Sequence, residues 1–271
     1  MACINCISGS IDRGTPTGKE LTVAGIPTYC ALPPGGKSNQ AVVIISDVFG
    51  WKFPNTRLVA DKIARQNFQV YVPDLHCNDS VPLNLFEVIT DPAPSFFRRC
   101  LQYLRLISRV PYFMMWLWRH RLEKSVPLLS TICDTLRSEP SFGITKLAAQ
   151  GYCWGGRHAI TEARTGKFDA FVSVHPSDVQ VPADLMHVAV PGCFILAKGD
   201  FMFGQRMVEK TQAFLKDQRP ALRVEFREYE GVHHGFAIRG CEDNPAVLAA
   251  RQDALQYGID FLKSVFGDKD K

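Results

Sequence analysis

The sequence predicts an α/β protein in which a mostly parallel central sheet carries helices on both faces. Short runs rich in β-branched residues alternate with longer segments of helical periodicity, and this alternation is typical of parallel sheets. The run 41–46 (AVVIIS) is apolar at nearly every position, as expected of a strand that is buried on both faces. These two observations define the expected fold class.

The elements of this sheet follow in order along the chain. Residues 21–24 and 28–32 flank a Gly-Ile-Pro turn and predict an early hairpin. Apolar runs predict buried strands at 41–46, 69–73, 146–152, 170–175 and 193–198. The run 222–228 alternates apolar and charged residues, which favours a strand near the sheet edge. Helices are predicted at 55–66 and from Asn244-Pro245 to about residue 265, because proline is favoured at the first helical position.

We expect one domain over residues 21–271, preceded by a flexible polar arm over residues 1–20. The chain contains nine cysteines at irregular spacing, and an odd, irregular set argues against a disulfide framework. The first residues lack the basic and apolar regions of a secretory signal. A cytoplasmic location, where thiols stay reduced, is therefore expected. Cys3 and Cys6 form a single Cys-x-x-Cys pair, which is insufficient for a structural zinc site.

A helical insertion around residues 80–140 interrupts the alternation of strands and helices. Residues 96–124 concentrate the basic charge of the chain, so a general nucleic-acid-binding protein is not expected. Within this segment, residues 112–118 (YFMMWLW) are dense in apolar bulk but too short to cross a bilayer, which takes about 20 residues. They fit a cap over the site, a helix packed on the core, or an interfacial helix. Of these three interpretations, the interfacial helix is the one that we do not expect, because it would require membrane contact.

Residues 151–156 (GYCWGG) connect the predicted strand 146–152 to a helix-compatible stretch. They match the Gly-x-Ser-x-Gly nucleophile elbow with Cys153 in place of the serine. Glycines tolerate the close backbone approach that such a sharp turn requires. The following helix would place its N-terminus beside the sulfur, which favours a thiolate. A lone buried cysteine is usually inert, so this motif alone proves little.

A cysteine nucleophile needs a base and a group that orients the base. Asp200 follows the predicted strand 193–198, and His234 follows the strand 222–228. The order nucleophile, acid, histidine is that of α/β-hydrolases. We prefer His234 over His233 because Gly235 allows the backbone to turn directly after it. The His-His pair has no third ligand with convincing spacing, so no metal site is predicted.

The chain resembles the dienelactone hydrolase (carboxymethylenebutenolidase) family, and in particular its fungal branch. The resemblance covers roughly residues 20–265 and rests on the elbow 151–156, the Asp200 turn, residues 234–237 (HGFA) and residues 46–50 (SDVFG). The sequence 175–177 (HPS) is similar to that of the fungal members. The resemblance implies an α/β-hydrolase fold and a catalytic triad of Cys153, Asp200 and His234.

The resemblance also implies roles for neighbouring residues. The backbone N–H groups of Trp154 and Val48 would form the oxyanion hole. Asp47 stands where the family has a glutamate that pairs with the resting thiol, and aspartate is one methylene shorter; alternatively, Asp47 is only a cap at the start of a loop. Arginines bind the substrate carboxylate in the family, and Arg239, Arg98 and Arg99 are candidates here, although each also fits surface charge. No metal or organic cofactor is expected.

The resulting hypothesis is an enzyme that hydrolyses a small-molecule ester or lactone, anionic or polyketide-derived, through an acyl-enzyme on Cys153. A second hypothesis keeps the fold but assigns non-hydrolytic chemistry in a fungal natural-product pathway, such as cyclisation, decarboxylation or dehydration of a polyketide. A third is a non-catalytic binding protein, since fold does not define function. The complete Cys, Asp and His set argues against the third.

Overall fold

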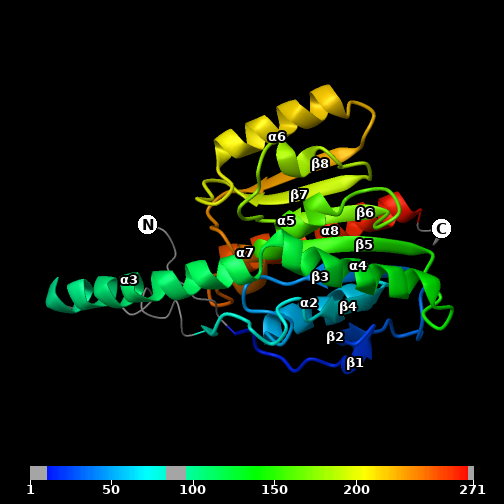
Figure 1. The fold of residues 1–271 in the computed structure, drawn as a ribbon, viewed down its shortest axis with the longest axis horizontal. Helices are drawn as coiled ribbons and strands as arrows, with labels where there is room; N and C mark the ends of the chain where they lie inside the picture. Colours follow the sequence, from blue (N-terminus) through cyan, green and yellow to red (C-terminus); the bar gives the residue numbers. More distant parts are fainter. Residues whose placement is uncertain (1–10, 84–95, 268–271) are drawn as a thin grey trace.

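A computed structural model of the chain describes residues 11–83 and 96–267 (Figure 1). Its centre is an eight-stranded sheet with the strand order β1-β2-β4-β3-β5-β6-β7-β8. The strands are β1 (Lys19–Val23), β2 (Ile26–Ala31), β3 (Gln40–Ile45), β4 (Gln69–Pro73), β5 (Lys146–Tyr152), β6 (Ala170–Val174), β7 (Gly192–Ala197) and β8 (Val224–Tyr229). The predicted α/β fold is confirmed.

The strand directions also agree with the sequence pattern. β1 pairs with β2 as the predicted antiparallel hairpin, and β2 pairs antiparallel with β4. From β4 to β8 all neighbours are parallel, and β8 forms the sheet edge as predicted. β3 pairs with β5 so that Ile45 lies opposite Gly151. The carboxyl ends of the two strands therefore meet at one edge of the sheet, where ligands bind in folds of this kind.

Helices cover both faces of the sheet and enclose two apolar cores. α4 (Leu122–Ser138), α5 (Trp154–Thr161) and α6 (Gln205–Gln218) pack on one face, together with the 3-10 turn η3 (Ala183–Leu185). α2 (Pro54–Ala64), α7 (Phe236–Arg239) and α8 (Pro245–Phe266) pack on the other. Successive strand residues alternate between the cores: Val43 faces the first and Val42 the second. Strands buried on both faces explain the continuous apolar runs.

The insertion around residues 80–140 forms two long helices. α3 (Phe96–Arg119) projects from the body of the molecule, whereas α4 returns along the sheet (Figure 1). Among the described residues, no helix is long and apolar enough to cross a membrane.

The segment before β1 is joined to the last helix by buried charges. Residues 1–10, which include Cys3 and Cys6, lie outside the described residues. Asp12 is buried and forms an ion pair with Arg251 of α8. Asn55 donates one hydrogen bond to Asp12 Oδ1 at 3.0 Å and another to the carbonyl of Ile238 in α7 at 2.8 Å. This network fixes the short helix α7, which directly follows His234.

Candidate active site

The backbone turns sharply at Cys153, between β5 and α5. Cys153 has φ 53° and ψ −113°, a conformation that is strained for a residue with a Cβ. Its N–H donates to the carbonyl of Val174 at 3.1 Å, and its carbonyl accepts from the amides of Gly156 and Ser177. These bonds hold the elbow to β6 and keep the side chain above the carboxyl end of the sheet.

Glycines are required on both sides of this turn. A Cβ at Gly151 would lie 2.0 Å from the carbonyl oxygen of Gly155, and a Cβ at Gly155 would lie 2.2 Å from that of Ile45. Backbone therefore packs directly on backbone between the elbow and the end of β3. The motif predicted this close approach, and it brings Cys153 beside the loop that follows β3.

The structure brings the three predicted triad residues together at the ends of three strands. His234 Nε2 lies 3.0 Å from Cys153 Sγ, and His234 Nδ1 lies 2.8 Å from Asp200 Oδ2. All three residues are buried. The amide of Met202 donates to Asp200 Oδ1 at 2.8 Å, which leaves Oδ2 directed at the histidine. Sulfur, imidazole and carboxylate thus form one continuous chain of contacts, whereas His233 contributes none of them.

The electrostatics of the site favour a charged pair. Burial raises the pKa of the Cys153 thiol, but the charge of His234 and its hydrogen bond outweigh burial, so that the pKa lies below its ordinary value. Burial lowers the pKa of His234, but the charge of Cys153 and the bonds to Asp200 and Cys153 together raise it to about 9. The arrangement therefore stabilises a thiolate beside an imidazolium, the reactive form of a cysteine nucleophile.

Asp47 is fully buried beside the triad but makes its contacts elsewhere. Its Oδ1 accepts from the amide of Phe49 at 3.0 Å, and its Oδ2 lies 3.4 Å from Arg239 Nε. Burial raises the pKa of Asp47, and the charge of Arg239 partly offsets this effect. The charge of Asp47 also raises the pKa of the Cys153 thiol. The carboxylate is thus close enough to influence the sulfur, but its ion pair is with Arg239.

The predicted substrate-binding arginines occupy different environments. Arg239 is buried, and its guanidinium lies over the ring of Phe49 at 5.0 Å, so its charge is directed at the Asp47 loop. The side chains of Arg98 and Arg99 lie outside the described residues; their backbone belongs to α3.

The predicted oxyanion-hole residues lie on two different segments. Trp154 is the first residue of α5, and amides of a first helical turn lack intrahelical partners. Val48 lies in the loop after β3, the strand whose end packs against Gly155. The carbonyl of Val48 accepts from the amide of Val81, which fixes this loop. The two predicted amides thus belong to segments that pack together at the elbow, and their role as an oxyanion hole stays a prediction.

Two further side chains at the site were not predicted from the sequence as functional residues. Ser177 Oγ lies 3.8 Å from Cys153 Sγ. The ring centroid of the buried His175 lies 5.2 Å from that of His234, and burial followed by the charge of His234 holds the pKa of His175 well below its ordinary value. Both residues follow β6, the neighbour of β5. Their place after a parallel strand was the signal that could have indicated them.

The junction of α3 and α4 lies against the elbow helix. The indole N–H of Trp154 donates to the carbonyl of His120 at 3.1 Å, and His120 Nε2 lies 2.8 Å from Asp79 Oδ2. Trp116, which is fully buried, packs near Trp154 with a ring separation of 6.1 Å. The base of the insertion is therefore a neighbour of the site, in agreement with the predicted cap or core packing of this part of the chain.

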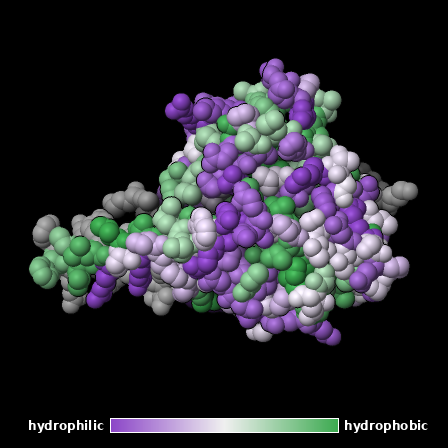
Figure 2. Space-filling view, viewed as in Figure 1, coloured by the Kyte–Doolittle hydropathy of each residue, from purple (hydrophilic) through white to green (hydrophobic). Residues whose placement is uncertain are grey.

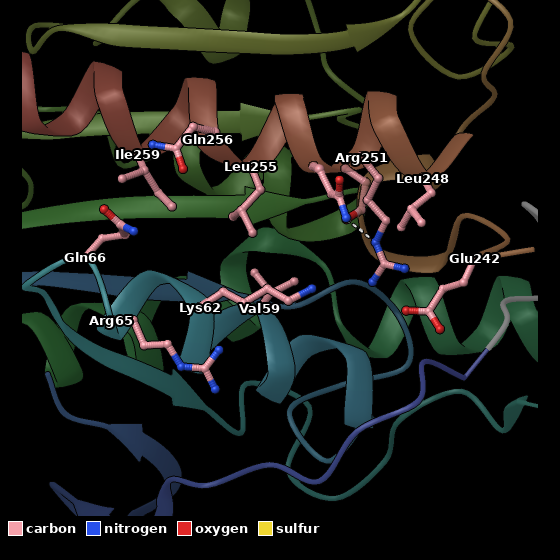
Figure 3. Close-up of a pocket in the computed structure, with 12 residues that line it drawn as sticks. Val59, Lys62, Arg65, Gln66, Glu242, Leu248, Arg251, Leu255, Gln256 and Ile259 are labelled. Carbon is pink, nitrogen blue, oxygen red and sulfur yellow. Dashed lines mark hydrogen bonds between the residues drawn. The ribbon is translucent and has the colours of Figure 1, made fainter. Parts of the chain in front are cut away.

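One hollow of the described structure lies away from the triad. A groove of about 340 Å³ runs between α2 and α8 and is lined by Lys62, Arg65, Arg251 and Leu255, among others (Figure 3). None of the three triad residues lines it. Within residues 11–83 and 96–267, no group of three or more His, Cys, Asp or Glu side chains could hold a metal ion.

The sheet order, the elbow at Cys153 and the sequence of Cys153, Asp200 and His234 along the chain define an α/β-hydrolase. Residues 26–266 match the profile described as "Dienelactone hydrolase family", and the chain belongs to this family.

Curated relatives match the chain over nearly its whole length. The "Hydrolase pyvD" of Aspergillus violaceofuscus is 26% identical over 94% of this chain and 93% of the relative. The "Hydrolase tropI" of Talaromyces stipitatus is 25% identical over 97% of this chain and 96% of the relative. The human "Carboxymethylenebutenolidase homolog" is 26% identical over 89% of each chain.

Solved structures support the fold. A putative dienelactone hydrolase from Klebsiella pneumoniae superposes with a TM-score of 0.64 at 16% identity, covering 92% of this chain and 99% of its own. Esterase 2 of Thermogutta terrifontis, phosphorylated by paraoxon, gives 0.65 at 15% identity, covering 95% and 98%. At such identities the likeness establishes the fold alone.

Proposed function

We propose that the protein hydrolyses a carboxylic ester or lactone through a thioester on Cys153. The observation that carries this proposal is the contact of 3.0 Å between Cys153 Sγ and His234 Nε2, in which the pKa of the thiol is lowered and that of the imidazole is raised. A thiolate at the strained turn before a helix is a competent nucleophile toward carbonyl carbon. Family membership gives the same reaction class.

In the acylation step, the Cys153 thiolate attacks the carbonyl carbon and forms the C–S bond. The carbonyl oxygen becomes an oxyanion between the amides of Val48 and Trp154, where each donor contributes about 3 kcal/mol to transition-state stabilisation. The C–O bond then breaks, and the leaving oxygen takes the proton from His234 Nε2. Asp200 keeps the ring oriented throughout.

In the deacylation step, His234 acts as a base. Its Nε2 removes a proton from water, the resulting hydroxide attacks the thioester, and the C–S bond breaks. The released sulfur is again a thiolate beside an imidazolium, so the resting pair is restored. No metal or organic cofactor takes part in this scheme.

Asp47 modifies this mechanism. Because Arg239 holds its carboxylate, Asp47 does not compete with His234 for the thiol proton, and the thiolate forms before substrate binds. With Arg239 committed to Asp47, its role is to position that carboxylate.

The thiols of the protein support a cytoplasmic setting. All seven described cysteines are free, which fits the reducing environment of the cytoplasm.

Phe201, on the loop after Asp200, is exposed and lies with its ring 5.7 Å from that of His234. An exposed apolar side chain beside the triad histidine favours an aromatic or polyketide-derived substrate.

A panel of lactones, anhydrides and activated esters tests the proposal. The wild type should release products whose combined mass exceeds that of the substrate by one water molecule, which separates hydrolysis from cyclisation, decarboxylation or dehydration. Cys153→Ala should lower kcat by at least about 10⁴-fold, since removal of a nucleophile leaves only the oxyanion hole and binding. Ser130→Ala, at a half-buried site on α4, serves as the control. Full turnover by Cys153→Ala would contradict the proposal.

A further inference from the structure

The helix α3 exposes an unusually large apolar face. Phe97 is 81% exposed, Leu104 63% and Trp118 63%, values that are rare for such large apolar side chains in series. Figure 2 shows the apolar residues gathered along α3 where it projects from the body. The exposed large apolar residues of α3 are Phe97, Leu101, Leu104, Ile107, Val110, Tyr112, Met114, Met115 and Trp118. We call this set the α3 apolar face.

The α3 apolar face is broad. Because successive helical residues lie about 100° apart, its members span roughly half of the helix circumference. A coiled-coil seam is a narrower stripe of positions a and d. The seam that runs through Leu104 and Met115 also contains Ser108 and Pro111, which are poor knobs for a partner helix. The breadth of the face fits a fluid apolar environment better than a second helix.

The α3 apolar face points away from the body of the molecule. Trp116 is fully buried, and Phe113 and Leu117 pack against the core, so the side of α3 that carries these three residues faces the protein. Arg119, at the end of the helix, lies 2.8 Å from Asp79 and fixes α3 to the loop after β4. The opposite side of the helix is therefore held toward the surroundings.

The charge of α3 has one sign. The helix contains five arginines and no acidic residue. Arg105 and Arg109 lie about 40° apart around the helix, on the side that carries Trp116 and outside the apolar face. A surface that is both apolar and negatively charged complements the helix.

Contrary to the expectation from the sequence, we propose that α3 binds the surface of an anionic lipid bilayer, with the α3 apolar face embedded at the level of the headgroups. An arginine-bearing polar side with Phe, Leu and Trp on the other is the composition of interfacial helices. Each basic residue near an anionic membrane surface adds to binding. The helix lies in the plane of the membrane rather than across it, in agreement with the absence of a membrane-spanning helix among the described residues.

Tryptophan fluorescence tests this proposal directly. The chain has four tryptophans, and Trp51, Trp116 and Trp154 are buried, whereas Trp118 is 63% exposed. The full-length protein is titrated with vesicles of phosphatidylcholine mixed with phosphatidylserine, and with vesicles of phosphatidylcholine alone. We expect a blue shift of the emission and co-sedimentation with the anionic vesicles only, both weakened by added salt. Trp118→Phe should remove the blue shift and keep the co-sedimentation.

Two sets of variants separate charge from apolar contact. Arg98→Glu with Arg105→Glu should lower the partition coefficient for anionic vesicles at least tenfold, and Arg206→Glu with Lys210→Glu, exposed on α6, makes the same change in net charge as a control. Leu104→Gln with Ile107→Gln should have a similar effect; both side chains are more than 60% exposed, so the fold should persist. Circular dichroism checks the fold of each variant.

Other outcomes would overturn the proposal. A blue shift that grows with protein concentration without vesicles would show that a second copy covers the α3 apolar face. Equal binding to neutral vesicles, or equal losses in the α3 and α6 charge variants, would remove the role of the arginines. No co-sedimentation with either vesicle would remove lipid as the partner.

Discussion

The Cys153 thiolate and the His234 imidazolium stabilise one another's charge. The charge of Cys153 is the largest of the effects that raise the pKa of His234, and the charge of His234 is the largest of those that lower the pKa of Cys153. The pair exists above the lowered pKa of the thiol and is lost when the pH rises through about 9, where His234 releases its proton.

We predict that Cys153→Ala lowers the pKa of His234 from its value of about 9, because the thiolate is removed and burial still disfavours the charged ring. An NMR titration of the histidine ring protons measures this change, with the resonance assigned through His234→Gln. Cys133→Ala, at a buried thiol on α4, is the matched control and should leave the titration unchanged. Identical titrations in wild type and Cys153→Ala would show that no ion pair exists.

Asp47 is paired with Arg239 rather than with the thiol, which is the partner that the resemblance implied for a glutamate one methylene longer. The shorter side chain accepts from the amide of Phe49, two residues later, and the ion pair with Arg239 takes the other oxygen. The resemblance to the family predicted that this carboxylate lies near the thiol. It could not predict the pairing, which depends on how α7 packs against the loop after β3.

At the scale of the element, the elbow depends on contacts between backbone atoms. Gly155 belongs to the first turn of α5, and the atoms nearest to its added Cβ are backbone atoms of Ile45 and Ser46. Backbone cannot rotate away as a side chain can. The glycine motif therefore encodes the distance between Cys153 and the loop that carries Val48.

We predict that Gly155→Ala destabilises the fold by about 2–3 kcal/mol, because overpacking against rigid atoms outweighs the gain in helix propensity. It should also lower kcat/KM, since the elbow must move away from the oxyanion-hole loop. Chemical denaturation and ester kinetics measure the two effects. Gly35→Ala is the control, because nothing lies within 4 Å of the added Cβ. Equal stability of the two variants would contradict the account of the elbow.

The insertion illustrates what a local pattern leaves open. Residues 112–118 fitted a cap, a core helix and an interfacial helix from the sequence alone. In the structure one helix has a buried side and an exposed side. Trp116 is buried against the body, whereas Trp118, half a turn later, is 63% exposed. Periodicity gives the faces of a helix, but only its packing decides which face is covered.

At the scale of the whole molecule, local patterns predicted the strands well. β4 and β5 have the predicted bounds, and β8 lies at the sheet edge, because burial on one or both faces leaves a direct pattern in the sequence. The order of the strands could not be predicted, since it depends on long-range pairing. The neighbours that this order creates, such as Ser177 beside Cys153, could be indicated only by their place after a parallel strand.

The candidate triad was predictable because each member follows a strand. Parallel strands end at one edge of the sheet, so Cys153, Asp200 and His234 converge although 81 residues separate the first from the last. We expect this convergence of the three side chains to produce a covalent intermediate on Cys153.

The most direct test is to locate that intermediate. Wild-type protein is mixed with an activated ester, quenched in acid within the first turnover, digested and mapped by mass spectrometry. We predict an acyl group on the peptide that contains Cys153, formed at the rate of the initial burst of alcohol release, and its absence in Cys153→Ala. Turnover without any acyl-protein, or an acyl group on another residue formed at the burst rate, would contradict the account.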